Sequence, residues 1–356
     1  MDQENTPLVP TSPQRWRRIA AITAVALVMA ELGAWALEPL LPSPNPWPTD
    51  QTAVKADQIM GLEAAGSSVD AVFLGSSVVV EGIDPLAFNG TAEELTGYNA
   101  ALDGASMKAA ALWAEEFVLP SLDPRVVVVG ITTRDLNDGG TSQEEFFRSL
   151  AASRGLRDIR LQTGLWKWVN EASQTSALLR LRPVLRQPGT ILRHLMGQSG
   201  PSEPPPGPYG SEPIDDSAFT YNDSESWHRL WRTRHFDHFA IGGEELSALE
   251  GLIGSALAQG REVVLVEMPV HNDYVKAQPG GEAALAELHE VLTSLAQPEG
   301  VHLISPLGAY GPEDFRDPAH LNPKAAEQLA VDLASYVAAV EGLSTASEGQ
   351  EQTPDT

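Results

Sequence analysis

Two adjacent serines, Ser76 and Ser77, stand where chemistry could take place, in the stretch VFLGSSVVVEGIDP at residues 72–85. An apolar run typical of a buried strand ends there at Gly75. Ligands of open α/β sheets bind beyond the carboxyl ends of the strands, and a glycine lets the chain turn sharply at that point. A serine hydroxyl presented there becomes a nucleophile if a base takes its proton. An ordinary β-turn is the alternative explanation of the same residues.

A candidate base lies far downstream, in the stretch FRDPAHLNPKAA at residues 315–326. The spacing of Asp317 and His320 lets a carboxylate orient the imidazole from the same loop while the imidazole faces a serine. Each motif is weak evidence alone. The pair is stronger, because each motif follows a predicted strand, the first and the last of the sheet. Together they predict a serine–histidine–aspartate triad.

Other histidines offer weaker chemistry. His235 and His238 are three residues apart and could pair on a metal, but no third ligand has a clear spacing, so we expect no metal site. His271, in MPVHNDYV at residues 268–275, follows a predicted strand and either lines the same crevice or belongs to an ordinary loop. The sequence has no glycine motif for dinucleotides or phosphates, and we expect no cofactor.

The elements that must position these residues are short β-branched runs that alternate with helical segments. Such apolar strands, separated by helices, are typical of a parallel sheet covered on both faces. We expect a single α/β domain at residues 52–341, doubly wound around five parallel strands in flavodoxin-like order, with an irregular insertion at about 186–226. The segment at 227–239, rich in Trp, Arg and His, either packs on the core or contacts a ligand. Strands are predicted at 71–75, 95–99, 125–131, 262–269 and 301–305, and helices at 104–119, 157–186, 243–260, 281–297 and 322–340.

The amino end predicts a membrane anchor. Residues 1–18 form a polar tail with three arginines near its end, and residues 19–37 are apolar apart from Glu31. A helix of that length nearly spans the ~30 Å hydrocarbon core. Because the arginines precede the span, the tail should be cytoplasmic and the bulk of the chain extracytoplasmic, in a single-pass cell-membrane protein. A signal peptide cleaved after Ala34-Trp35-Ala36 and a buried soluble helix are the alternatives.

Composition narrows the partners. The chain has 356 residues, with 23 Lys and Arg against 48 Asp and Glu, a net charge of −25. Such a balance argues against a nucleic-acid partner, which needs a basic face. The absence of cysteine excludes disulfides, thiolate catalysis and cysteine-bound metals. Residues 38–51, rich in proline, should form a stiff linker, and residues 342–356 a disordered acidic tail.

The blocks FLGSS, GIDP, YNAALDGAS, VVVVG and DPAHLNPKAAEQLA resemble the successive blocks of SGNH (GDSL-type) hydrolases. The closer likeness is to membrane-anchored members that act on cell-envelope polymers as O-acyl esterases or acyltransferases. The resemblance covers most of the domain, as short blocks. It implies that Ser77 is the nucleophile, with Ser76 in a slot that is usually acidic, and that His320 and Asp317 complete the triad.

The resemblance also implies an oxyanion hole formed by the backbone N–H groups of Ser77 and Gly104 and by an asparagine amide in the third block. That block here reads Gly130-Ile131-Thr132, so the asparagine is missing from its slot. A substitute donor could come from the stretch GITTRDLND. The candidates are Thr132, Thr133, Arg134 and Asn137.

The function implied is that of a serine esterase or O-acyltransferase that works through an acyl-enzyme. Its expected substrate is an acylated glycan or glycolipid of the cell envelope, and a membrane acyltransferase is a candidate partner. The missing asparagine supports the alternative, a non-catalytic glycan-binding or scaffold domain of a membrane assembly. The retained Ser77, Asp317 and His320 favour the enzyme.

Overall fold

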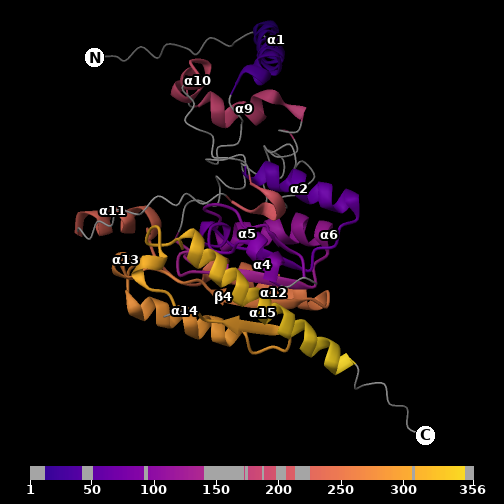
Figure 1. Cartoon of the computed structure of the whole chain (residues 1–356). Helices are drawn as coiled ribbons and strands as arrows, with labels where there is room; N and C mark the ends of the chain where they lie inside the picture. Colours follow the sequence, from indigo (N-terminus) through magenta and orange to yellow (C-terminus); the bar gives the residue numbers. More distant parts are fainter. Residues whose placement is uncertain are drawn as a thin grey trace. The chain divides into compact units, whose positions relative to one another are not determined.

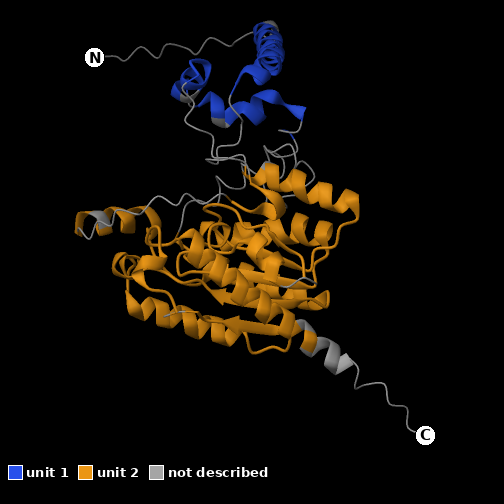
Figure 2. Ribbon diagram, viewed as in Figure 1, with its two compact units in different colours: residues 1–46, 161–201 blue, residues 47–160, 202–356 orange. Residues whose placement is uncertain are grey.

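The computed structural model describes residues 13–41, 51–91, 95–139, 172, 175–186, 188–197, 206–212, 225–306 and 309–348. The chain divides into two compact units, each made of two stretches of sequence (Figure 2). Unit 1 consists of Met1–Pro46 and Leu161–Pro201, and unit 2 of Trp47–Arg160 and Ser202–Thr356. The domain was expected to run without a break from 52 to 341. In the structure, residues 161–201 belong instead to the unit that contains the amino-terminal helix.

A five-stranded parallel sheet forms the centre of unit 2 (Figure 1). Its neighbour order is β2-β1-β3-β4-β5, and every neighbouring pair is parallel. All five predicted strands are present, and the prediction of an α/β protein with five parallel strands is confirmed. The strands are β1 (Ala71–Leu74), β2 (Gly97–Asn99), β3 (Val126–Ile131), β4 (Glu262–Glu267) and β5 (Val301–Ile304).

The strands are apolar without alternation because both faces of the sheet are covered. Every residue of β1 and β3 is buried, whichever face it occupies. Gly130, near the carboxyl end of β3, allows the close packing of the segment that follows β1. A Cβ atom there would lie 2.3 Å from Cγ2 of Val79, so any other residue would push that segment away.

Unit 2 has helices at the positions predicted at 104–119, 243–260, 281–297 and 322–340, and several short ones that the sequence does not indicate clearly. The predicted helix at 157–186 lies mostly outside the described residues, and its described end, Ala177–Leu185, is a helix of unit 1. The predicted helix at 322–340 is longer in the structure, where it continues to Glu348, within the stretch expected to be an irregular tail. The helices are α2 (Gln51–Ala65), α3 (Ser77–Val80), α4 (Pro85–Thr91), α5 (Met107–Trp113), η2 (Ala114–Val118), α6 (Leu119–Leu122), η4 (Pro208–Gly210), α11 (Glu225–His235), α12 (Gly243–Ala258), α13 (Asn272–Ala277), α14 (Glu282–Leu295), η5 (Pro312–Asp314) and α15 (Pro323–Glu348).

Unit 1 contains the helices α1 (Pro13–Leu37), η1 (Glu38–Leu40), α9 (Ala177–Leu185) and α10 (Pro188–Leu195). The stretch from Arg15 to Leu40 is long and apolar enough to cross a membrane, and very little of it is buried by other parts of the protein. The region expected to be an irregular insertion, 186–226, holds the helix α10 and the turn η4. The linker expected at 38–51 begins with η1, and its residues 42–50 lie outside the described part.

Candidate active site

The turn after β1 presents Ser77 and hides Ser76. Gly75 has φ +148°, and a Cβ atom there would lie 2.5 Å from Val79 Cγ2 and 2.7 Å from the carbonyl oxygen of Gly130. Only glycine therefore fits at this turn. The side chain of Ser76 is 1% exposed, and its hydroxyl has no hydrogen-bond partner among the described residues. Ser77 begins α3 and is only partly buried.

A continuous hydrogen-bond chain links Ser77 to the loop before α15. The Oγ of Ser77 lies 2.8 Å from Nε2 of His320, and Nδ1 of His320 lies 2.7 Å and 2.9 Å from the two carboxylate oxygens of Asp317. With the Nδ1 proton directed at Asp317, Nε2 is left as the acceptor for the serine proton. The contact expected between the two strand-end motifs is present, and it selects Ser77 over Ser76.

The loop that carries the base is held by its own backbone. The Oδ1 atom of Asp317 accepts the backbone N–H of Ala319 at 2.8 Å and that of His320 at 3.0 Å. Phe315 and Leu321 form a β-bridge across the loop, and Asn322 caps α15 by accepting the N–H of Ala325 at 3.0 Å. These contacts fix the spacing of Asp317 and His320, so the imidazole faces Ser77 without rearrangement.

The environment of His320 favours its protonated form. Burial opposes the charged form of Asp317, but hydrogen bonds from His320 and Ala319 outweigh it and lower the pKa of Asp317. Burial likewise opposes the charged form of His320, but the hydrogen bond and charge of Asp317 outweigh it and raise the pKa of His320. Asp317 is thus held as a carboxylate, and the imidazole gains affinity for the serine proton.

A salt bridge that the sequence does not reveal ties the two halves of the triad together. Nε of Arg316 lies 2.8 Å from the carboxylate of Glu81 and 3.9 Å from that of Asp317. Glu81 directly follows α3, and Arg316 directly precedes Asp317 in the chain. The signal in the sequence is only that two opposite charges stand beside the two motifs. The bridge joins the end of the helix that begins at Ser77 to the loop that carries Asp317 and His320.

Two backbone N–H groups are available on the oxyanion side. Within the described part of the chain, no acceptor binds the N–H of Ser77 or of Gly104. Gly104 has φ +63°, which favours glycine, and its loop approaches the nucleophile turn because Leu102 N–H donates to the carbonyl of Gly75 at 3.1 Å. Both donors implied by the resemblance therefore remain free for an oxyanion.

Asn99, at the end of β2, is a buried organising residue that the sequence did not single out. Its amide nitrogen donates to the carbonyl oxygens of Val79 at 3.0 Å and Ile83 at 2.9 Å, and its oxygen accepts the N–H of Ala101 at 3.1 Å. These bonds use both ends of the amide, so Asn99 holds the end of α3 and offers no donor to a substrate.

Most candidate donors after β3 are engaged by other groups of the protein, either in the same loop or in segments packed against it. The backbone N–H and hydroxyl of Thr132 both donate to Oδ2 of Asp135, each at 2.7 Å. The Thr133 hydroxyl lies 2.5 Å from the amide oxygen of Gln278. The amide nitrogen of Asn137 donates to the carbonyl of Asp237 at 3.4 Å, and its amide oxygen accepts the N–H of Ala240 at 3.0 Å. Thr132, Thr133 and Asn137 thus serve to hold the loop.

Arg134 differs from its neighbours. It is half-buried, its backbone N–H donates to the Tyr274 hydroxyl at 3.1 Å, and its guanidinium has no hydrogen bond or ion pair within the described residues. It forms no ion pair with the neighbouring Asp135, whose Oδ2 accepts from Thr132. Burial raises the pKa of Asp103, while the charges of His320 and Arg134, among others, oppose that rise. The charges of Arg134 and His320 therefore both act on the carboxyl group of Asp103.

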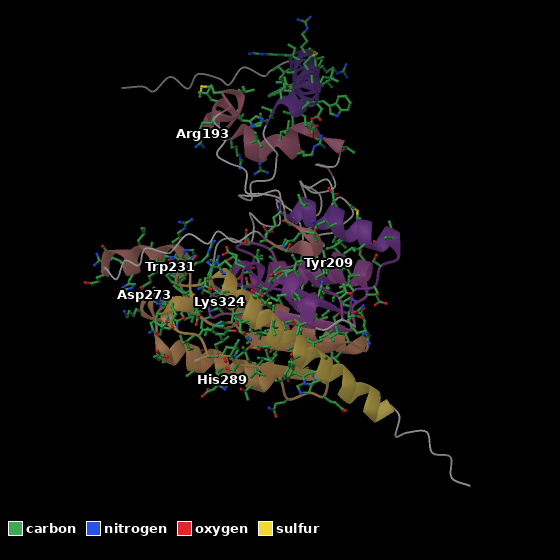
Figure 3. The ribbon with its side chains drawn as sticks, in the orientation of Figure 1. Arg193, Tyr209, Trp231, Asp273, His289 and Lys324 are labelled. Atoms are coloured by element: carbon green, nitrogen blue, oxygen red, sulfur yellow. The ribbon has the colours of Figure 1, made fainter. Side chains whose placement is uncertain are left out.

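His235 belongs to the aromatic packing of α11. Its ring lies 4.5 Å from that of Trp231, and Trp231 in turn packs edge-on against Tyr274 of α13 at 5.6 Å (Trp231 is labelled in Figure 3). Burial and the charge of Arg134 lower the pKa of His235 to about 4. His238 is exposed, and no group of three potential metal ligands occurs in the described ranges. The interpretation that the segment at 227–239 packs on the core thus describes α11 best.

His271 is a buried residue that contacts the loop around Asp317 and His320. It is 7% exposed, its Nδ1 accepts the N–H of Asp273 at 3.1 Å, and its backbone N–H donates to the carbonyl of Pro318 at 3.0 Å. Its ring packs edge-on against Phe315 at 5.6 Å. His271 therefore contacts the Asp317–His320 loop, and its accessible surface is too small for a substrate-lining role.

Acidic groups line an open cavity beside α3. The cavity has a volume of about 190 Å³ and is bounded by Glu81 but not by Ser77 or His320. Lys55 is fully buried nearby: its ammonium donates to the carbonyl of Ala101 at 2.8 Å, and burial lowers its pKa to about 8. The cavity is lined by Val80, Glu81, Ile83, Asp84, Pro85, Glu212 and Pro323.

The comparisons with known proteins name no relative. No family model and no curated protein matches the sequence. The contact between Ser77 and His320 is the main structural indication of the chemistry of this site.

Proposed function

We propose that unit 2 is an SGNH-like serine esterase or O-acyltransferase with Ser77 as its nucleophile. The observation that carries the proposal is the 2.8 Å contact between Ser77 Oγ and His320 Nε2, with Asp317 behind the imidazole. The strand order β2-β1-β3-β4-β5 supports the finer fold assignment, because flavodoxin-like doubly wound sheets have this order. Ser77 and His320 also belong to the strand-end blocks that resemble the family.

In the proposed reaction, His320 removes the proton of Ser77 as its oxygen attacks the carbonyl carbon of an O-acyl ester. Asp317 stabilises the imidazolium that forms. His320 then returns the proton to the leaving alcohol, and the acyl group stays on Ser77. Water, or a sugar hydroxyl activated by the same imidazole, resolves the acyl-enzyme. Water makes the protein an esterase, and a sugar hydroxyl makes it a transferase.

For the oxyanion, we infer two backbone donors and one side-chain donor. The N–H groups of Ser77 and Gly104 have no other acceptor among the described residues. Arg134 is the remaining donor after β3, since the hydroxyls and amide around it are engaged. A guanidinium offers several N–H groups and is always charged, so it suits a developing oxyanion.

The proposed location is the outer face of a cell membrane, with α1 as the anchor. Three arginines near the start of the apolar stretch favour a cytoplasmic amino end. An acylated envelope glycan or glycolipid is the substrate class that such a position favours, and a membrane acyltransferase is a partner that could supply the acyl group.

A fluorophosphonate probe tests the activated serine. The wild-type protein should react covalently, Ser77→Ala should not, and Ser76→Ala is the matched control because it removes the adjacent, buried hydroxyl. Labelling that survives in Ser77→Ala would reject the assignment. Equal absence of labelling in all three proteins would favour the second candidate, a non-catalytic glycan-binding or scaffold domain, which the engaged side chains of Thr132 and Asn137 support.

A further inference from the structure

The amino terminus of α9 holds an acidic residue of the apolar helix α1. Glu31 accepts the hydroxyl of Ser176 at 2.8 Å and the backbone N–H of Leu178 at 3.4 Å, and it also bonds the N–H of Ala177. These are groups that a helix leaves without partners at its start. They replace the water that a carboxylate within an apolar span would otherwise need.

A second contact aligns α9 with the end of α1. The guanidinium of Arg180 binds the carboxylate of Glu38 with two hydrogen bonds of 2.7 Å. Between the two acidic residues, Ala34 packs against Ala177 and Leu181. Glu31 and Glu38 are seven residues apart, or about 10 Å along a helix. The helix α9 therefore lies against the last two turns of α1.

These contacts set the depth of α9 if α1 spans a membrane. Glu31 lies thirteen residues after Arg18, the last of the leading arginines, which is about 20 Å along the helix. That distance is about two thirds of the ~30 Å hydrocarbon core. The start of α9 would then lie in the outer half of the bilayer, and α10, which follows within a few residues, would lie at the same surface.

The helix α10 has the amphipathic pattern of a helix that lies on a membrane surface. Leu192, Leu195 and Met196 are 57%, 62% and 51% exposed, and their spacing puts them on one face. Arg193, labelled in Figure 3, and His194 are also exposed and occupy the other face. A soluble helix would bury such a leucine face against a core.

Charge points to an anionic partner. Residues 176–196 contain four arginines and neither Asp nor Glu, in a chain whose net charge is −25. Arg180 is buried and bonds Glu38, and the side chains of Arg186 and Arg193 are exposed at the surface. Arginine on the polar face and leucine on the apolar face are the features of interfacial helices that bind anionic lipid surfaces.

We propose that α9 and α10 form a membrane-surface element that lies in the outer leaflet beside α1. Its leucine face enters the boundary between headgroups and acyl chains, to a depth of about 5–10 Å, and Arg186 and Arg193 contact anionic phospholipid headgroups. This inference rests on the proposed membrane anchor and continues the apolar surface of that helix. It gives the protein a second membrane contact, formed by a segment about 145 residues away in sequence.

The absence of cysteine from the chain makes a direct test available. Single-cysteine variants of the full-length protein are labelled with an environment-sensitive fluorophore and reconstituted in vesicles of phosphatidylcholine and phosphatidylglycerol that contain doxyl-labelled lipids as depth-dependent quenchers. Leu192→Cys reports the apolar face of α10, and His194→Cys reports its polar face. Ile22→Cys reports the anchor, and Leu86→Cys is the control, an exposed leucine of unit 2.

Labels at Ile22 and Leu192 should be quenched, that at Leu192 most strongly by shallow doxyl groups, and those at His194 and Leu86 should not. Quenching at Ile22 but not at Leu192 would overturn the inference and leave the anchor intact. A blue-shifted but unquenched Leu192 label would mean that a protein partner, and not lipid, covers α10. An unquenched Ile22 would reject the anchor and this inference together.

The charge contact has its own measurement. Adding Arg186→Gln and Arg193→Gln to the Leu192→Cys protein should reduce quenching at Leu192 severalfold in vesicles with phosphatidylglycerol and leave it unchanged in phosphatidylcholine alone. Equal quenching of the two proteins in both vesicle types would overturn the assignment of the arginines to anionic headgroups.

Discussion

The loop that carries Asp317 and His320 and the loop that follows β3 make different kinds of hydrogen bond. On the base side, the polar atoms of Asp317 and His320 form a chain that ends on the serine hydroxyl. After β3, Thr132 bonds Asp135 of its own loop, and Asn137 bonds the segment between α11 and α12. The first arrangement can move a proton, whereas the second mainly holds the backbone in place. Polar residues at a strand end thus indicate where a site lies, but only their hydrogen bonds tell which of them can act.

The largest effect should come from breaking the base side. His320→Ala and Asp317→Asn should each lower kcat for p-nitrophenyl acetate by about 10⁴-fold, because the serine loses its base or the imidazole loses its correct tautomer. The melting temperature should change little, since both groups are partly exposed. Steady-state turnover and thermal melting measured on the same preparations check this. A variant that retains more than a tenth of wild-type turnover contradicts the role of its residue.

A smaller loss of activity should follow from Arg134→Ala. If Arg134 serves the oxyanion only in the transition state, kcat should fall by about 10²–10³-fold with little change in KM. Arg125→Ala is the matched control, because Arg125 stands at the opposite end of β3 and forms an exposed ion pair with Asp70. Equal kinetics in the two variants would mean that only backbone N–H groups bind the oxyanion. That result would favour the alternative, a non-catalytic glycan-binding or scaffold domain.

The salt bridge of Glu81 should appear in the pH profile. The charge of Glu81 is one of the influences that raise the pKa of His320, and the charge of Arg316 opposes them. Activity is lost as the pH falls through that pKa, since a protonated imidazole cannot accept the serine proton. The acid limb of kcat/KM should therefore move to lower pH in Glu81→Gln and to higher pH in Arg316→Gln. Shifts in the same direction in both variants would argue against an electrostatic positioning role.

The smallest effect on activity is expected from Thr132→Val. Its hydroxyl donates to a buried carboxylate of Asp135, so losing it should lower the free energy of unfolding by about 1–3 kcal/mol and leave kcat nearly unchanged. Denaturant unfolding and turnover of the same variant separate the two effects. A large fall in kcat without loss of stability would mean that Thr132, and not Arg134, fills the missing asparagine slot.

Local patterns were enough to predict the sheet and the triad. The strands are continuous apolar runs such as RVVVVGI, without alternating polar residues, because both faces of the sheet are buried. The motifs that contain Ser77 and His320 follow the first and the last of these strands. The state of Arg134 could not be predicted in the same way. Arg134 and Asp135 are adjacent in the sequence but do not pair, and Asp135 bonds Thr132. Adjacent charges in a sequence do not show which hydrogen bonds the fold will form.

Contacts between distant segments were also beyond the sequence. Glu31 looked like a flaw in an apolar span, because its partners at the start of α9 lie about 145 residues further along. The stretch at about 186–226 was predicted to be irregular because it is rich in Pro, Gly and Ser, although α10 within it has a regular leucine face. Glu81 and Arg316, 235 residues apart, meet only because the sheet brings the ends of β1 and β5 to one edge.

Trapping the acyl-enzyme tests the central claim most directly. The wild-type protein is mixed with p-nitrophenyl acetate, quenched in acid within the first turnover, digested and analysed by mass spectrometry. The account predicts an acetyl group on Ser77, and none there when His320 is replaced by alanine. An acetyl group on Ser76, or on neither serine while the ester is being hydrolysed, would contradict it.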